Sequence, residues 1–132
     1  MNNSIYFNRN GGTVVADIDL DGNMEVIFAD VYNWQGTWNG KAYVLYGSNG
    51  NNMTSYDVGN GGTYASISVA NVDSDDYPEI IVPTQFGIKV LDYTQSTNKL
   101  TEKCSTTHGL LESSPVIYDV DNCDFGGIYF EF

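Results

Sequence analysis

Short apolar runs and acidic loops alternate along this chain, and the same order recurs three times. In the first unit, the apolar run at 14–16 precedes an acidic loop at 17–25, and a second apolar run at 26–29 follows it. The segments 71–79 and 119–124 have similar apolar flanks, so that the three loops start 54 and 48 residues apart. No segment keeps a helical period, whereas short runs rich in Val, Ile, Tyr and Phe are typical of strands. The pattern therefore predicts an all-β protein built from repeated units.

Each complete unit is predicted to hold four short strands separated by Gly- and Asn-rich turns. The apolar runs before and after the acidic loop form the first two strands. In the first two units the third strands are expected at 41–46 and 87–93, and the fourth strands at 53–58 and 99–104. We expect a single repeat region over 1–132, with a strand in 1–12 that completes a neighbouring unit, a first unit at 13–62, a second at 63–109 and half of a third at 110–132.

The acidic loops carry the candidate chemistry. In the first loop Asp17, Asp19 and Asp21 alternate with other residues, and Gly22 and Glu25 follow. Carboxylates this close together disfavour joint ionisation unless a cation lies between them. Oxygen ligands suit a hard cation, Ca²⁺ above all, and the glycine allows the chain to turn sharply around it. The repeated loops therefore predict Ca²⁺ as the cofactor, with two sites and a third that the sequence leaves open.

The overall charge restricts the partners. The chain has 17 acidic residues against five Lys and Arg, which gives a formal net charge of −12. Nucleic acids and anionic membranes both need a basic surface, so neither is expected as a partner, and no apolar run is long enough for a membrane span. Calcium sites of this kind suit millimolar extracellular calcium, so we expect a secreted or cell-surface protein.

The spacing Asp-x-Asp-x-Asp-Gly also occurs in EF-hands, which need helices on both sides and a Glu at position twelve. Position twelve is Phe28 in the first loop and Val82 in the second, and the flanks are β-like. The EF-hand interpretation is therefore rejected.

Residues 16–27 and the strands that follow resemble the FG-GAP/VCBS repeat, a family that includes the calcium-binding β-propeller blades of integrin α-subunits and rhamnogalacturonan lyases. The resemblance implies four-stranded propeller blades, of which about two and a half fit this chain. It also implies side-chain ligands at loop positions one, three, five and nine, with a backbone carbonyl at position seven. The implied ligands are Asp17, Asp19, Asp21, Asn23 (carbonyl) and Glu25 in the first loop, and Asn71, Asp73, Asp75, Tyr77 (carbonyl) and Glu79 in the second.

The third loop departs from the family pattern. Asp119 and Asp121 are in place, but Cys123 stands at position five and Asp124 comes one residue late. Either an insertion lets Asp124 reach the ion or the site is lost. Two cysteines allow one bridge or two free thiols, and an oxidising extracellular setting favours a bridge between Cys104 and Cys123.

The function expected from these features is a structural, adhesive or interaction module in which calcium fixes the strand connections. An incomplete propeller leaves blade edges open, so the expected partners are other copies of the chain or the rest of a longer propeller. Trp34 and Trp38, on the connection between the second and third strands, are candidates for a glycan or protein interface. The alternative is part of a polysaccharide-acting propeller enzyme. The single histidine, His108, lies in a turn-like stretch and is not assigned a catalytic role.

Overall fold

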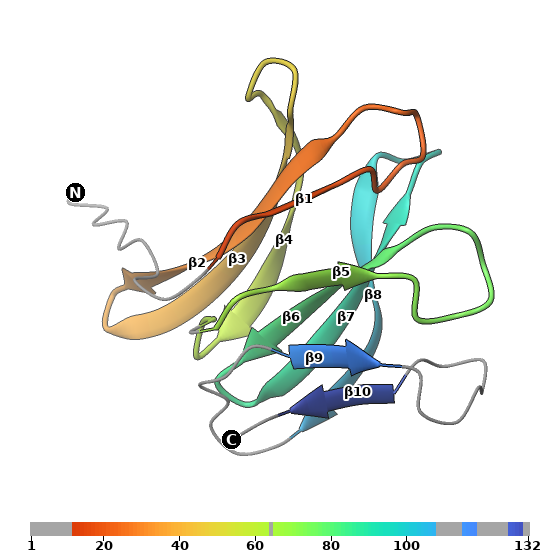
Figure 1. Cartoon of the computed structure of the whole chain (residues 1–132). Helices are drawn as coiled ribbons and strands as arrows, with labels where there is room; N and C mark the ends of the chain where they lie inside the picture. The colour runs from red at the N-terminus through yellow and green to blue at the C-terminus, as the bar shows by residue number, and fades with distance from the viewer. Residues whose placement is uncertain (1–11, 64, 108–114, 119–126, 131–132) are drawn as a thin grey trace.

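The structure is a computed structural model that describes residues 12–63, 65–107, 115–118 and 127–130, and these residues form ten strands (Figure 1). The strands are β1 (Val14–Ala16), β2 (Glu25–Trp34), β3 (Thr37–Tyr46), β4 (Asn52–Asn60), β5 (Ser68–Ala70), β6 (Glu79–Thr84), β7 (Gly87–Thr94), β8 (Lys99–Thr107), β9 (Pro115–Tyr118) and β10 (Gly127–Phe130).

All strand pairs are antiparallel, and neighbours in sequence are neighbours in each sheet. Strands β1-β2-β3-β4 form one four-stranded sheet, β5-β6-β7-β8 form a second, and β9 pairs with β10. The described residues contain no helix, and therefore no helix that could cross a membrane. The prediction of an all-β chain is confirmed, and so is the absence of helices beside the two acidic loops.

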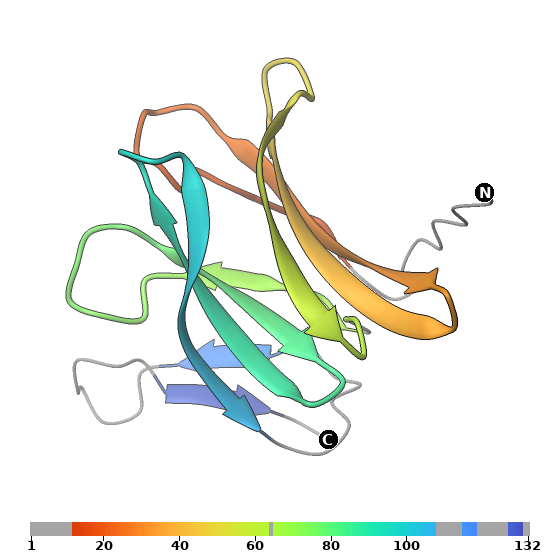
Figure 2. The ribbon, with the colours of Figure 1, turned by 180° about the vertical axis from the view of Figure 1, so that it is seen from behind.

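The two four-stranded sheets pack face to face, and the main core lies between them (Figure 2). Burial alternates along β3, so that Ala42 and Val44 face this core while their neighbours in the strand are more exposed. The second sheet contributes Ile80 and Leu91, which are paired across β6 and β7 and are almost fully buried. Burying a side chain of this size stabilises a fold by about 1.5–3 kcal/mol, so this interface holds the two sheets together.

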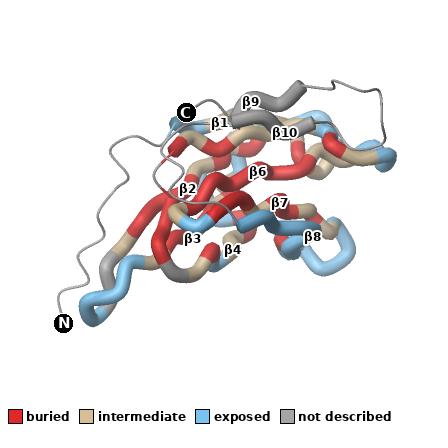
Figure 3. Tube along the Cα trace, turned by 90° about the horizontal axis from the view of Figure 1, so that it is seen from below, coloured by how far each residue is buried: buried red, intermediate tan, exposed pale blue. Residues whose placement is uncertain are grey.

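The second sheet is the middle layer of the molecule. Every residue of β6 is buried, as the continuous red stretch in Figure 3 shows. Ile81 and Val90 pack with Val72 and Ile88 in a second cluster, on the face away from the first sheet. Strand β5 also contacts β9. The short apolar run that forms β6 is thus buried on both sides, which explains why it shows no alternation of polar residues.

The hairpin between β2 and β3 corrects one expectation. Trp34 and Trp38 do not lie on a loop, because β2 continues to Trp34 and β3 begins at Thr37. Gln35 and Gly36 both have positive φ angles, 50° and 83°. Two such residues form a tight hairpin turn that matches the twist of the strands, so the strands extend to the tip.

Candidate metal sites

The two acidic loops connect equivalent strands of the two sheets. The first loop (residues 17–25) joins β1 to β2, the second (residues 71–79) joins β5 to β6, and both project from the right-hand side of Figure 1. Each loop starts directly after a three-residue strand and ends on a glutamate that opens the next strand. The pairing places Ala16 opposite Glu25 and Ala70 opposite Glu79, so a small residue faces each buried carboxylate.

The first acidic cluster consists of Asp17, Asp19 and Glu25, each of which offers an oxygen within 4.8 Å of the others. Glu25 is only 2% exposed, and its Oε2 accepts a hydrogen bond of 3.0 Å from the Ile18 backbone N–H. Burial raises the pKa of Glu25, and the charges of Asp19 and Asp17 raise it further. A buried carboxylate beside two others is stabilised in its ionised form by a cation.

Hydrogen bonds within the first loop stabilise its bent backbone conformation. The backbone N–H groups of Asp21 and Gly22 donate to the two oxygens of Asp17, at 3.1 and 2.9 Å. Gly22 has a φ of 92°, which glycine adopts without strain. The Asp21 carboxylate accepts from the backbone and side-chain nitrogens of Asn23, which lowers the pKa of Asp21. Three of the four predicted side-chain ligands are therefore together, while Asp21 is turned toward Asn23.

A close backbone contact fixes the end of the first loop. Gly47 donates its N–H to the Met24 carbonyl at 3.1 Å. A Cβ at position 47 would collide with that carbonyl oxygen. The turn after β3 therefore requires glycine to hold the residue before Glu25 in place.

The second acidic cluster consists of Asp73, Asp75 and Glu79, again with oxygens within 4.8 Å of one another. These are loop positions three, five and nine, whereas the first cluster uses positions one, three and nine. Glu79 is fully buried, and its Oε2 accepts from the Val72 N–H at 2.8 Å. Burial raises the pKa of Glu79, as it does for Glu25. In both loops, therefore, the glutamate at the ninth position accepts a hydrogen bond from the backbone N–H of the second position.

The side chain of Asn71, at the first position of the second loop, forms hydrogen bonds that hold the loop backbone. Asn71 Oδ1 accepts from the Asp73 N–H at 3.2 Å, and Asn71 Nδ2 donates to the Asp75 carbonyl. The Asp75 N–H in turn donates to Asp73, and the Tyr77 N–H donates to Asp75. These side-chain-to-backbone bonds over two residues are Asx turns, which bend the loop as they do in the first one.

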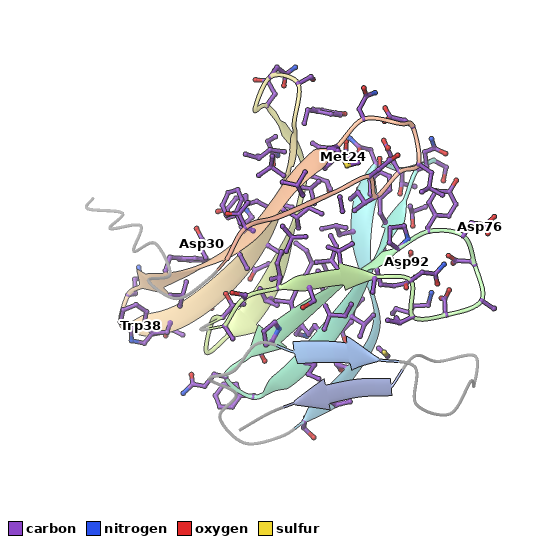
Figure 4. All side chains as sticks on the ribbon, viewed as in Figure 1. Met24, Asp30, Trp38, Asp76 and Asp92 are labelled. Carbon is purple, nitrogen blue, oxygen red and sulfur yellow. The ribbon has the colours of Figure 1, made fainter. Side chains whose placement is uncertain are left out.

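Two residues of the second site were missed from the sequence. The Lys103 ammonium forms ion pairs with Asp73, with Asp75 at 3.8 Å, with Glu79 at 3.3 Å and with Asp92 at 4.0 Å. In the sequence Asp92 lies outside the acidic loops, and no pattern there pairs it with them. Burial raises its pKa and the charge of Asp75 adds to this effect, and Figure 4 shows it beside the second loop.

Other predicted residues do not join these clusters. Trp38 is 43% exposed and lies at the end of the molecule opposite Asp76 of the second loop (Figure 4). Cys104 lies exposed on β8 and forms no disulfide within the described part of the chain. The remaining predicted positions lie outside the described residues. They are Asp119, Asp121, Asp124, Cys123, His108, residues 1–11 of the strand expected in 1–12, and the side chain of Trp34. The carbonyl ligands at Asn23 and Tyr77 and the Cys104–Cys123 bridge stay predictions.

Each of the two acidic clusters can hold a metal ion. Their donors are oxygens only, which are the ligands of hard cations rather than of zinc or copper sites rich in nitrogen and sulfur. A scan of the chain against protein-family models found no match, and a search of curated proteins found none either.

Proposed function

We propose that both loops bind Ca²⁺ and that the protein is an extracellular structural module whose strand connections are fixed by these ions. The observation that carries the proposal is the repeated position of the buried glutamate. In each loop this carboxylate holds the backbone at the second loop position and also meets two aspartates. Loops with several carboxylates suit Ca²⁺ better than Mg²⁺, because Ca²⁺ accepts six to eight oxygens in irregular geometry.

The position of the clusters supports a structural role for the ion. Asp17 and Glu25 lie at the two ends of one loop, and a cation between them joins the end of β1 to the start of β2. Ile18 and Val72, between the ligands, are buried in the two hydrophobic clusters. An ion in either loop is therefore coupled to the packing of the core.

The stacking of the sheets supports a propeller-like assembly, in line with the resemblance to FG-GAP/VCBS repeats. Two four-stranded sheets of the same strand order pack on each other, β1 lies beside β5, and β5 contacts β9. Further sheets, from the same chain or from other copies, extend this series in our proposal and act as its partners. Light scattering tests the self-assembly, since a stable monomer in calcium would exclude it.

A calcium titration tests the binding itself. We expect isothermal titration calorimetry to show at least two Ca²⁺ bound per chain, with dissociation constants of roughly 10⁻⁴–10⁻³ M, as in extracellular modules. Mg²⁺ at the same concentrations is the control, and weaker binding is expected because it demands near-ideal octahedral geometry. Absence of saturable Ca²⁺ binding would refute the proposal.

A further inference from the structure

The second acidic cluster already contains a positive charge, and the first does not. The Lys103 ammonium lies among the carboxylates of Asp73, Asp75 and Glu79, and its side chain is 27% exposed. Within the part of the chain that the structure describes, no lysine forms an ion pair with the first acidic cluster. Both loops share the hydrogen bond from the second loop position to the buried glutamate, but only the second has a lysine among its carboxylates.

A β-bulge at the same place in each sheet explains how Lys103 reaches the second loop. The pairing of β3 with β4 shifts between Val44 and Leu45, and the pairing of β7 with β8 shifts between Val90 and Leu91. Each shift leaves one unpaired residue on the last strand of the sheet. These unpaired residues are Met53 in β4, between Asn52 and Thr54, and Lys103 in β8, between Glu102 and Cys104.

The two bulge residues have different surroundings. Met53 is 6% exposed and belongs to the main hydrophobic core. Lys103 reaches the carboxylates of the second loop and also lies 4.0 Å from Asp92. A bulge re-aims a side chain without changing the strand order. The same position in the fold therefore carries an apolar side chain in the first sheet and a cation in the second.

We propose that Lys103 is a tethered counter-ion of the second site, which holds the metal-free loop together and competes with the metal. This inference rests on the proposed calcium binding. An ammonium and a Ca²⁺ ion cannot both contact the same three carboxylates, because like charges repel strongly at that range. Calcium must therefore displace Lys103 toward solvent, so the second site is weaker and fills after the first.

Replacing Lys103 by Met, the residue at the equivalent bulge of the first sheet, tests this inference. The full chain carries Asp19→Ala to disable the first site, and calorimetry then measures Ca²⁺ binding with and without K103M. We expect K103M to lower the dissociation constant of the second site about tenfold, a change of about 1.4 kcal/mol. K103Q, which keeps a polar side chain, is expected to act in the same direction, and circular dichroism checks that each variant is folded.

Two controls make the result specific to the second loop. Lys89 pairs with the exposed Glu102 at 2.6 Å and not with the cluster, so K89M should leave the affinity unchanged. Asp75→Ala, added to the chain that carries Asp19→Ala, should abolish the calcium binding that calorimetry measures. Any binding heat that remains would come from a site other than the second loop.

The outcomes separate this inference from the proposed function. Unchanged affinity in both K103M and K103Q would overturn the role of Lys103 while leaving calcium binding intact. A second result would also overturn the role of Lys103, namely that the unaltered chain binds Ca²⁺ but no variant with a disabled first site does. Calcium binding would then be restricted to the first loop. If the unaltered chain binds no Ca²⁺ at all, both fail.

Discussion

Replacing Glu25 by Ala is expected to abolish calcium binding at the first loop and to lower the free energy of unfolding in calcium by about 4–6 kcal/mol. Two effects add. The buried Ile18 N–H loses its acceptor, which costs about 1–3 kcal/mol, and the stabilisation by a bound ion, about 2.7 kcal/mol at a hundredfold excess over the dissociation constant, is lost. Denaturant unfolding in calcium, together with calorimetry, measures both.

Glu25→Gln is the matched variant that separates these effects. The amide oxygen can still accept from Ile18, but the charge that attracts the cation is gone. We expect the calcium affinity of the first loop to fall at least about tenfold. In a chelator, E25Q should be at least as stable as the unaltered chain, because a neutral group avoids the penalty of a buried charge. An E25Q protein that binds calcium normally would contradict the ligand assignment, and so would an E25A protein of unchanged stability.

Removal of calcium by a chelator is expected to lower the free energy of unfolding of the unaltered chain by about 5 kcal/mol when both sites were filled at a hundredfold excess. For a chain of this length, that corresponds to a fall in melting temperature of more than about 10 °C. Without the ion, the carboxylates at 17, 19 and 25 repel one another around a buried group, and the same holds at the second loop except where Lys103 compensates.

Scanning calorimetry in EDTA, and then after calcium is restored, measures this loss. Mg²⁺ in place of Ca²⁺ is the control and should restore only part of the stability. A melting temperature that does not depend on calcium would show that the loops hold their shape by hydrogen bonds alone.

The strand order and both described loops follow from local signals in the sequence. The apolar runs around 17–25 and 71–79 are short and flanked by turn residues, so they predict β1, β5 and β6 with small errors in their bounds. The end of β2 was predicted too early, because the strand continues past residue 29 to Trp34. The glutamate at position nine is also visible in sequence, although its contact with the second loop position is not. The prediction failed where turn chemistry was overlooked, because Gln35 and Gly36 alone turn the β2–β3 hairpin.

Contacts that depend on register and on sheet packing could not be predicted. Lys103 reaches the second cluster only because a bulge leaves it unpaired on β8, and no pattern in the sequence marks that bulge. Asn98, in the turn after β7, is another example. It has a φ of 52°, accepts from the Tyr93 hydroxyl and donates to the Met53 carbonyl of the first sheet at 3.1 Å. Such contacts join residues far apart in the chain and become visible only in three dimensions.

The most direct test of calcium binding is the position of the ions. Crystals grown in excess calcium, or with terbium in its place, give anomalous differences that locate each ion without assumptions about its ligands. We expect one peak about 2.3–2.6 Å from carboxylate oxygens of Asp17, Asp19 and Glu25. We expect a second peak at the same distances from Asp73, Asp75 and Glu79, with the Lys103 ammonium displaced from the cluster. Ordered loops without a peak at the first cluster, in crystals saturated with calcium, would show that this loop is not a calcium site.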